Sequence, residues 1–600
     1  MRWKKYINWS VFIKLLSIQT GHNATVCLME NGEITALLSQ EKIDNIKNSA
    51  TFPREAIEAV LTERKLSSQD IDEVVIAGTI IFPQHCLDPL GQEVASDHLN
   101  PPLTIRFGKR MEKGLTGMFL PDVFRFFRAR RHAKLHAEAL VHLHNQLREL
   151  GLANKPLRFI DHHLCHARAA YHALEREPGR EALVFTLDGM GDGLSASVSR
   201  VGPSGEWRRI AETPIKASLG TIYSETTRFL GMKVMEHEYK VMGLAAYCTG
   251  YHLDTYRRVF ETVIDLDPDN PLSFTASLDT ADFYDYLAKH AVGERFDNIA
   301  GALQHLLEER VTRWIANAIK ETGISRIFTG GGVFMNVKLN KRIQEMEEVE
   351  QAWFLPSCGD ESNPLGAAYA RAVELKLPLK SLANLYLGTS YSRDTLSTFI
   401  EQNRLADSYA VTEPADVEEA CAELLSQGQV VARFSGRCEW GARSLGNRAI
   451  LAHPSHLESF YTVNDLIKAR DFWMAFAPTV LDSWASRYME SYDSGWARVP
   501  HMVTAFRATA LGVQHLRAAM HQGDFTIRAQ VLEREVNPEY YRLLQAFERL
   551  TGVGGLMNTS FNLHGYPLVA TPAQALMTFE RSGLQNLVLG PFLISKGEGT

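Results

Sequence analysis

The segment DHHLCHARAAY, residues 161–171, carries three histidines and one cysteine, which together suggest a metal site. In a helix, residues four positions apart project from the same face, so His162 and His166 would point in one direction. His163 and Cys165 would point elsewhere. A surface helix that merely carries histidines has the same pattern, so the pair needs ligands from other parts of the chain before it defines a site.

Two aspartates are candidates for these further ligands. Asp188 closes the apolar run VFTLD, and Asp360 follows AWFLPSCGD. An aspartate in either place is also typical of a turn or a helix cap. Two imidazoles and two carboxylates would form a nitrogen and oxygen donor set that suits Fe(II), Mn(II) or Zn(II). The sequence alone does not bring the four residues together.

A second group of candidate residues lies in the last third of the chain. The Gly-punctuated stretch GRCEWGARSLGNR contains Arg437, Arg443 and Arg448, whose planar guanidinium groups could bind phosphate oxygens. Surface ion pairs are the alternative interpretation of these arginines. Lys468 adds a compact cation for negative charge at a transferring phosphorus. In MNTSFN, alternate residues would share one face of an extended chain and could bind phosphate or other polar groups: Asn558, Ser560 and Asn562.

An α/β framework has to position these groups, and the sequence repeats one unit of it. LLSIQTGHNATVCLMENGEI (15–34) and VFTLDGMGDGLSASVSRVGPSGEW (184–207) each indicate a strand, a Gly-containing turn, a strand and a second turn. ISRIFTGGGVFMN (324–336) adds a strand, three glycines and a helix start, where backbone could approach a phosphate or adenosine. The pattern favours a duplicated actin/hexokinase-like ATP-binding domain, although an α/β enzyme that holds another phosphate ligand would share it.

Length and composition set the class of protein. Six hundred residues exceed what one hydrophobic core supports, so two or more domains are expected. The formal net charge of −7 argues against a general nucleic-acid binder. The seven cysteines are scattered and form no CxxC pair, which fits a reducing cytoplasm and argues against a disulfide framework.

A loss of periodicity in LPLKSLANLYLGTSYSRDT (377–395) predicts the domain boundary. We expect a first domain over residues 1–380, a linker over 381–395 and a second α/β domain over 396–600. The second domain would begin with a helix at 416–428 and a strand at 429–436.

The N-terminus has a basic start and an apolar middle, as a signal peptide does. Lys14 interrupts the apolar run and no small-residue cleavage site follows, so VFIKLLSIQ predicts a buried strand instead. No other run approaches the roughly 18 apolar residues of a membrane span, and a cytoplasmic location without membrane contact is expected. The basic and aromatic segment 109–150 predicts a solvated helical insertion with an apolar stripe; RNA binding is its alternative.

The chain resembles the ATP-dependent O-carbamoyltransferases of the nodulation-factor, cephamycin, novobiocin and tobramycin type. The matching stretches follow one another nearly end to end: DHHLCHARAAYH, TLDGMGDGLSASV, EYKVMGLAAY, FTGGGVFMNVKLN, PSCGDESNPLGAAYA, GRCEWGARSLGNRAILAHP, ARDFWMAFAPTVL and MNTSFNLHGYPLVATP. The resemblance implies an actin-like N-terminal domain and a C-terminal domain similar to threonylcarbamoyl-AMP synthases. It also implies that the second domain forms carbamoyl-adenylate from carbamoyl phosphate and ATP, and that the first transfers the carbamoyl group to a hydroxyl of a small-molecule acceptor.

The resemblance assigns roles residue by residue. It implies a metal, most often Fe(II), with Zn or Mn as alternatives and Mg accompanying ATP, and the metal ligands would be His162, His166, Asp188 and Asp360. The carbamoyl-adenylate would be held in the N-terminal domain by Lys240, Gly243, Gly330, Gly331, Gly332 and Asn336. The candidate catalytic residues are Lys468, Arg443 and His22, the last for assisting deprotonation of the acceptor hydroxyl. Equally, His22 could only structure the first turn.

The chain departs from the family pattern at a few positions. Asn23 stands where family members commonly have Asp after the histidine, so any orienting role there would lack its charge. GARSLG replaces the common GPRALG, with Ala442 and Ser444, and Ala475 replaces a usual Pro.

Two other functions remain open at this point. An actin-like ATPase with a regulatory or chaperone-type role would turn over ATP independently of carbamoyl phosphate. A tRNA threonylcarbamoyl transferase would depend on threonine and tRNA, which the net charge disfavours. The acceptor and the oligomeric state, including a homodimer, are not predicted.

Overall fold

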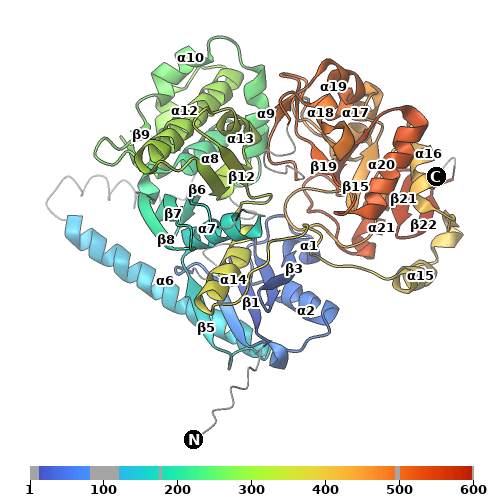
Figure 1. Ribbon diagram of the computed structural model, residues 1–600, viewed down its shortest axis with the longest axis horizontal. Helices are drawn as coiled ribbons and strands as arrows, with labels where there is room; N and C mark the ends of the chain where they lie inside the picture. Colours follow the sequence, from blue (N-terminus) through green and yellow to red (C-terminus); the bar gives the residue numbers. More distant parts are fainter. Residues whose placement is uncertain (1–11, 82–120, 175–176, 178, 493–500, 598–600) are drawn as a thin grey trace, which may run out of the picture.

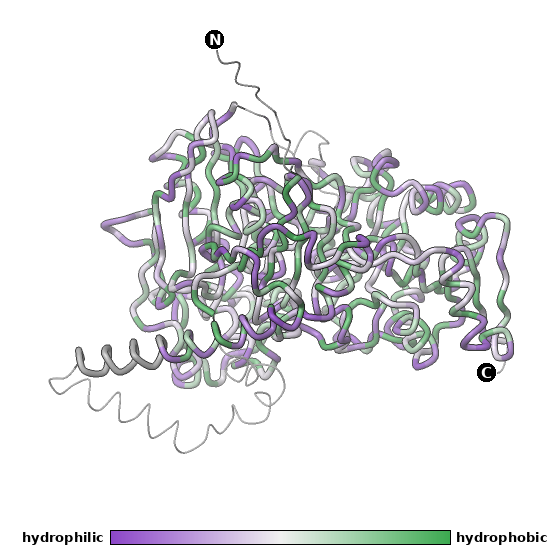
Figure 2. Tube along the Cα trace, turned by 90° about the horizontal axis from the view of Figure 1, so that it is seen from below, coloured by the Kyte–Doolittle hydropathy of each residue, from purple (hydrophilic) through white to green (hydrophobic). Residues whose placement is uncertain are grey.

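The computed structural model describes residues 12–81, 121–174, 177, 179–492 and 501–597, with the backbone alone for 121–133. Two α/β halves lie side by side, the N-terminal half in blue to yellow and the C-terminal half in orange and red (Figure 1). Hydrophobic stretches gather inside both halves and hydrophilic ones follow the outer loops (Figure 2). The start of the chain, and the part of the basic segment before residue 121, lie outside the described residues.

Two five-stranded sheets of the same design form the N-terminal half. The first has the order β3-β2-β1-β4-β5: Glu33–Ser39, Thr25–Glu30, Lys14–Gln19, Glu73–Ala77 and Leu157–Ile160. The second has the order β8-β7-β6-β11-β12: Trp207–Pro214, Leu194–Val201, Ala182–Gly191, Arg326–Gly330 and Gln351–Phe354. In each sheet the first three strands in sequence are antiparallel and the last two run parallel to the first. This repeat confirms the predicted duplicated, actin/hexokinase-like domain and the buried strand β1.

Two helices lie between the sheets. α7 (His162–Ala173) contacts β6 and β11 of the second sheet, whereas α14 (Asn363–Glu374) contacts β1 and β4 of the first, and the two helices pack against each other. At their crossing, a Cβ on Gly366 would come within 1.7 Å of the Cys165 carbonyl oxygen, so the close approach requires glycine. The remaining helices of this half are α1 (Glu41–Asp44), α2 (Arg54–Glu63), α6 (Pro121–Glu149), α8 (Leu219–Phe229), α9 (Glu238–Leu244), α10 (His252–Thr255), α11 (Phe283–His290), α12 (Phe296–Thr322) and α13 (Val337–Gln344), with a short hairpin of β9 (Ile264–Leu266) and β10 (Phe274–Ala276).

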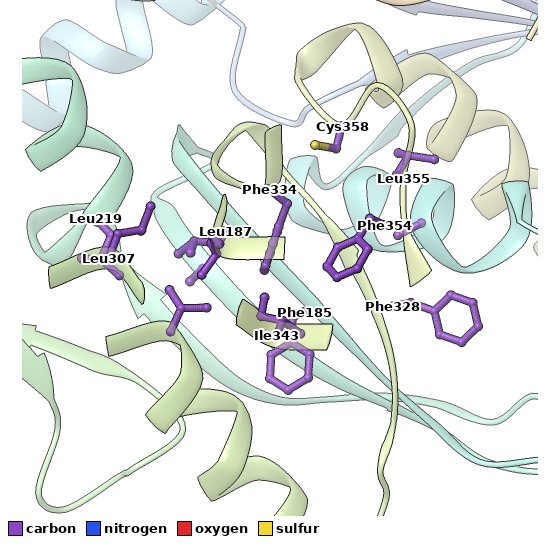
Figure 3. Packing of buried hydrophobic residues seen from close by; sticks show 14 of the residues in the cluster. Phe185, Leu187, Leu219, Leu307, Phe328, Phe334, Ile343, Phe354, Leu355 and Cys358 are labelled. Atoms are coloured by element: carbon purple, nitrogen blue, oxygen red, sulfur yellow. The ribbon is translucent and has the colours of Figure 1, made fainter. Parts of the chain in front are cut away.

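The largest core cluster surrounds the second sheet. Phe185 on β6 packs edge-on against Trp314 of α12, with ring centroids 4.9 Å apart, and Phe328 on β11 stacks on Trp353 at 4.5 Å. Figure 3 shows part of this cluster, including Leu187 directly before Asp188. The core therefore fixes the strand end from which one candidate ligand projects.

The C-terminal half is built on one mixed sheet of eight strands. Its order is β13 (Ala410–Thr412), β22 (Phe592–Ser595), β21 (Asn586–Leu589), β14 (Val431–Phe434), β15 (Arg448–Ala452), β20 (Gly555–Ser560), β16 (Ala477–Leu481) and β19 (Gln530–Leu532). Ala449 and Leu451 belong to the core on one face of the sheet and Ile450 and Ala452 to the core on the other, as the two-residue strand period requires. The predicted helix and strand at its start are present as α16 (Val417–Ser426) and β14.

The other elements of this half surround the sheet. They are α15 (Arg393–Gln402), α17 (Leu457–Val463), α18 (Asp482–Tyr488), α19 (Ala510–His515), α20 (Pro538–Thr551), α21 (Pro572–Glu580) and a short pair of β17 (Phe506–Arg507) and β18 (Thr526–Ile527).

The segment between α14 and α15 joins the halves and is fastened to the first. Leu385 and Tyr386 are buried in the N-terminal core, and the N–H of Leu37 on β3 donates to the Leu387 carbonyl at 3.1 Å. The domain boundaries at 380 and 396 stay a prediction.

α6 projects from the N-terminal half away from the C-terminal half (Figure 1). Ala139, Leu143 and Leu147, spaced four apart, are buried, whereas Val141 and His142 are exposed. The predicted helical insertion with an apolar stripe is therefore present.

Candidate functional site

The four predicted metal ligands meet in one cluster between the two sheets. His162 and His166 come from the first turns of α7, Asp188 from β6 at the point where its pairing with β7 becomes irregular, and Asp360 from a 3₁₀ turn (η8, Asp360–Ser362) before α14. One ligand atom from each residue lies within 4.8 Å of every other. Residues nearly two hundred positions apart thus converge where α7 and α14 cross.

The distances between the ligand atoms match those around one metal ion. The two Nε2 atoms are 3.1 Å apart, and His162 Nε2 lies 3.3 Å from Asp188 Oδ2 and 3.5 Å from Asp360 Oδ1. His166 Nε2 lies 3.4 Å from Asp360 Oδ1. Bonds of about 2.1 Å to one ion, at tetrahedral or octahedral angles, separate neighbouring ligands by about 3.0–3.4 Å. The residues present fit a divalent metal.

Hydrogen bonds orient three of these ligands from behind. Ser362 Oγ lies 3.3 Å from His166 Nδ1, and Asn363 Nδ2 lies 3.4 Å from His162 Nδ1, so both imidazoles offer Nε2 to the cluster. The Gly332 N–H donates to Asp188 Oδ1 at 2.9 Å and leaves Oδ2 facing the histidines. Such outer contacts normally fix the ring and carboxylate orientations at a metal site.

Asp192 anchors the start of α7. Its carboxylate accepts from the backbone N–H groups of Thr79, Ile80 and His162, each at 2.8 Å. Asp161 caps the same helix by accepting from the Leu164 N–H at 2.7 Å. The sequence analysis missed Asp192, although its place four residues after Asp188 in DGMGDG was a visible signal.

The electrostatics of the cluster suit a cation. Burial opposes a charge on His162, but the carboxylates of Asp360 and Asp188 outweigh it and raise its pKa to about 9. Burial also opposes a charge on Asp188, yet His162 and His166 hold its pKa below the ordinary value. Two carboxylates thus stabilise positive charge at the position that a metal would take.

His163 and Cys165 point away, as the helical spacing predicts. His163 Nδ1 lies 2.8 Å from Thr186 Oγ1 on β6, and burial, followed by the neighbouring His162 and His166, lowers its pKa to about 4. The Cys165 thiol donates to the carbonyl of Ile160, the last residue of β5, at 3.6 Å.

The three glycines after β11 allow close packing beside the metal cluster. A Cβ on Gly330 would approach the His166 carbonyl oxygen to 2.7 Å, and one on Gly331 the Leu187 carbonyl oxygen to 2.4 Å. A Cβ on Gly332 would lie 2.9 Å from Asp188 Oδ1. Their adenylate-binding role stays a prediction.

The other predicted adenylate-binding residues have partners within the protein. The Asn336 side chain accepts from the Leu339 N–H at 2.9 Å and donates to Gln304 Oε1 at 2.8 Å. Lys240 Nζ lies 3.1 Å from Asp471 Oδ2 of the C-terminal half, and Gly243 faces Trp473 of that half. Lys240 and Gly243, both on α9, therefore lie at the boundary between the halves.

His22 is partly exposed on the first turn, close enough to interact electrostatically with Glu238 of α9. Asn23 has φ 55° and its amide donates to Glu361 Oε2 at 3.4 Å. The amide that replaces the family's Asp therefore faces a carboxylate next to the metal ligand Asp360. A catalytic role of His22 stays a prediction.

Lys468 occupies a buried pocket made by the MNTSFN segment. It ends a π-helical turn (Asn464–Lys468), and its Nζ donates to the carbonyl and side-chain oxygens of Ser560 and Asn562 at 2.5–3.2 Å. Burial, followed by Arg470 and Lys47, lowers the pKa of Lys468. The predicted trio of Lys468, Ser560 and Asn562 is thus brought together.

Three arginines form the centre of a positively charged group beside it. Arg443, Arg470 and Arg528 interact electrostatically with one another. In the part of the chain that the structure describes, their guanidinium groups make no hydrogen bond or ion pair, and the Glu361 carboxylate acts on Arg443 from a greater distance. Burial lowers the pKa of all three, and in Arg528 the other two arginines lower it further. Unpaired guanidinium groups that converge in this way are suited to a polyphosphate.

The sequence analysis missed Arg470 and Arg528. Arg470 stands two residues after Lys468 in KARDFW, which was a usable signal. Arg528 lies in TIRAQ, outside any glycine-rich stretch, and nothing in the sequence distinguishes it from a surface arginine.

The remaining predicted phosphate ligands are engaged elsewhere. Arg448 is fully buried and donates to four backbone carbonyls, and Arg437 donates to Thr35, Leu387 and Gly388 carbonyls and lies 3.6 Å from Glu63. Asn558 donates to the Ser444 carbonyl at 3.2 Å and so holds the loop that carries Arg443. Phosphate binding by these three residues stays a prediction.

The two centres touch across the boundary between the halves. The Ala442 N–H donates at 3.3 Å to Ser357 Oγ, and the Ser357 hydroxyl donates to the Glu361 carboxylate. The loop with Arg443 therefore packs against the loop with Asp360, which places the arginine group next to the metal cluster.

Comparison with known protein families identifies the family of this chain. Residues 14–369 match the family description Carbamoyltransferase N-terminus, and residues 422–596 match Carbamoyltransferase C-terminus. The chain belongs to the carbamoyltransferase family. It is therefore a transferase, as the sequence resemblance predicted.

Relatives of this carbamoyltransferase match about half of its length or nearly all of it. Nodulation protein NolNO of Sinorhizobium fredii is 30% identical over 96% of this chain and 79% of its own. The 3′-hydroxymethylcephem-O-carbamoyltransferase of Amycolatopsis lactamdurans is 26% identical over 49% of this chain and 54% of its own. Among solved structures, full-length HypF in the phosphate- and nucleotide-bound form has a TM-score of 0.36 at 14% identity and covers 62% of this chain and 56% of its own.

Within the described ranges, none of the helices of this carbamoyltransferase combines the length and the apolar character that a membrane crossing requires.

Proposed function

We propose that this carbamoyltransferase works in two steps at two centres. In the C-terminal half, water would hydrolyse carbamoyl phosphate to carbamate and phosphate, and a carbamate oxygen would then attack the α-phosphorus of ATP to give carbamoyl-adenylate and pyrophosphate. In the N-terminal half, a hydroxyl of a small-molecule acceptor would attack the carbamoyl carbon and release AMP. The observation that carries the proposal is the contact between an unpaired arginine group and a two-histidine, two-aspartate cluster.

The first step uses the cationic group of the C-terminal half. Arg443, Arg470 and Arg528 bind the phosphate oxygens of ATP and carbamoyl phosphate, because each guanidinium presents a planar set of donors. Lys468 Nζ, held by Ser560 and Asn562, neutralises charge that develops as the pyrophosphate leaves. Buried cations without carboxylate partners are effective here because little solvent screens them.

The second step uses the residues around the metal cluster. The metal, with Fe(II) as the first candidate, would be held by His162, His166, Asp188 and Asp360 and would supply Lewis-acid polarisation of the carbamoyl carbonyl. His22 accepts the proton of the acceptor hydroxyl. The adenylate lies against the Gly330–Gly332 segment, whose glycines pack closely beside the metal ligands His166 and Asp188.

The contact between the loops supports direct passage of the adenylate. Ala442, next to Arg443, donates to Ser357, three residues before Asp360. A carbamoyl-adenylate formed at the arginines would need only a short displacement to reach the metal cluster, and this limits its hydrolysis in bulk water.

The test is incubation of the protein with ATP and carbamoyl phosphate, without an acceptor. We expect pyrophosphate release that depends on carbamoyl phosphate, together with carbamoyl-AMP detected by mass spectrometry. Release of ADP and phosphate regardless of carbamoyl phosphate would instead indicate an actin-like ATPase. Dependence on threonine and tRNA would indicate a threonylcarbamoyl transferase.

A further inference from the structure

The hairpin between β6 and β7 lies directly against the metal cluster. It begins after the ligand Asp188, and its Gly191 backbone packs on the His162 ring so closely that a Cβ would come within 2.0 Å of Cδ2. Met190, at the middle of this hairpin, is 62% exposed. A large apolar side chain therefore projects to the outside two residues from a metal ligand.

Two exposed isoleucines flank the same hairpin. The Ile80 N–H donates to Asp192 Oδ1 at 2.8 Å, and the Ile215 N–H donates to the Gly193 carbonyl at 3.2 Å. Ile80 is 47% and Ile215 42% exposed. Hydrogen bonds thus hold the backbones of Ile80 and Ile215 at the turn that follows Met190, and we call these three exposed residues, from three separate segments, the apolar lip.

The glycines of the hairpin distinguish its inner side from its outer side. Gly191 faces the His162 ring, whereas a Cβ on Gly189 or Gly193 would meet no atom of the described residues within 4 Å. The described residues therefore leave room at the two glycines on either side of Met190 and Gly191. Single exposed apolar residues are common on protein surfaces, but three around one hairpin beside a reaction centre need an explanation.

We propose that the apolar lip binds an apolar group of the acceptor, so that the natural acceptor is an alcohol with a hydrocarbon portion near its reactive hydroxyl. This inference rests on the proposed function. Three side chains offer too little area for a protein partner, which usually covers about 800 Å² on each side. Methionine adapts to apolar ligands of varied shape, which suits a small-molecule contact.

The reaction at this position balances as an ordinary acyl transfer. The acceptor oxygen forms a bond to the carbamoyl carbon, and the bond from that carbon to the phosphate oxygen of the adenylate breaks. AMP leaves with the electron pair, and the hydroxyl proton passes to His22 and then to water. The apolar lip takes no part in these bonds. It affects only which alcohol binds as the acceptor.

The test uses a series of simple acceptors: ethanol, 1-butanol and 1-hexanol, with ATP and carbamoyl phosphate. Alkyl carbamate formation is followed by mass spectrometry. We expect kcat/KM to rise at least tenfold from ethanol to hexanol, and the ratio of the two values to fall at least fivefold in Met190→Asn and in Ile215→Asn. Leu550→Asn, an equally exposed apolar position on α20, is the matched control and should keep the ratio. Equal kcat/KM values along the series would overturn the proposal.

A binding measurement separates this inference from the proposed function. Saturation-transfer NMR detects 1-hexanol on the protein without ATP or carbamoyl phosphate. Hexanol binding that Met190→Asn removes and Leu550→Asn retains would support the lip even if no carbamate formed, in which case the proposed function would fail alone. Carbamate formation with hexanol binding unchanged by Met190→Asn would sustain the function and overturn the lip.

Discussion

The two centres of the molecule manage charge in opposite ways. In the metal cluster, two histidines face two aspartates, and the carboxylates raise the pKa of His162 to about 9. In the arginine group, Arg443, Arg470 and Arg528 face one another with no ion pair to a carboxylate among the described residues, and Glu361 acts on Arg443 only from a greater distance. In the first centre, positive and negative charges nearly cancel without a ligand. The second centre carries like charges that a bound anion would compensate.

This difference shows what kind of ligand each centre is built to receive. Compensated N and O donors at 3.1–3.9 Å leave the place of one small cation. Converging guanidinium groups repel one another, which lowers the free energy of unfolding. A bound anion would offset this repulsion. The predictions below test the contrast, from the largest expected effect to the smallest.

Removing cations from the second centre should abolish adenylate formation. In Lys468→Met and Arg528→Gln, we expect carbamoyl-phosphate-dependent pyrophosphate release to fall at least about a hundredfold, because positioned cations no longer meet the developing charge. Metal content, measured by elemental analysis, should stay unchanged. Thermal stability should not decrease in Arg528→Gln, because repulsion among the arginines is relieved. Arg542→Gln, on the exposed face of α20, is the control; activity retained in Arg528→Gln would refute the phosphate site.

Weakening the support of the metal cluster should reduce metal affinity without affecting the other centre. Asp192→Asn cannot accept at both oxygens and loses part of its hold on the His162 backbone. We expect metal affinity, measured by calorimetric titration, to drop about tenfold, within the range for outer contacts of metal ligands. Pyrophosphate release should be unaffected, and Asp254→Asn should match the wild type. An unchanged affinity in Asp192→Asn would show that α7 needs no such anchor.

Each centre should be stabilised only by its own kind of ligand. A divalent metal at about one hundred times its Kd should raise the free energy of unfolding by about 2.7 kcal/mol, and inorganic pyrophosphate at the same relative excess by a similar amount. His166→Ala should lose the first effect and keep the second, and Arg528→Gln should do the reverse. Differential scanning calorimetry measures both, and loss of both effects in one variant would contradict their independence.

The smallest effect concerns an ion pair between the two halves. Lys338 pairs with Asp524 across the boundary; burial opposes the charge of Asp524, but His521 and Lys338 hold its pKa below the ordinary value. The pair therefore stabilises the protein above about pH 4 and loses its effect as the carboxyl protonates at lower pH. We expect Lys338→Met to cost about 1 kcal/mol at pH 7, because the pair is partly exposed. If Lys338→Met lowered the free energy of unfolding by the same amount at a pH at which Asp524 is protonated, this ion pair could not be the cause.

The sequence predicted the metal cluster better than the arginine group for a physical reason. Local spacing pairs His162 with His166, which are four apart on one helix, whereas the family resemblance added Asp188 and Asp360 to the ligand set. Arg528 is separated from Arg443 by more than eighty residues, and only the packing of the eight-stranded sheet against its loops brings them together. Arg448 shows the converse, because its place in a glycine-rich stretch suggested phosphate binding while its guanidinium is buried among carbonyls. The duplicated sheets could be predicted because each turn and its two flanking strands are formed by residues that are neighbours in the sequence.

The division of labour between the centres is tested most directly in His166→Ala. Pyrophosphate release with ATP and carbamoyl phosphate, and carbamate formation on an added alcohol, are measured on the same preparation. The account predicts that pyrophosphate release stays near the wild-type rate while carbamate formation is lost. Equal loss of both reactions in a folded protein would contradict it.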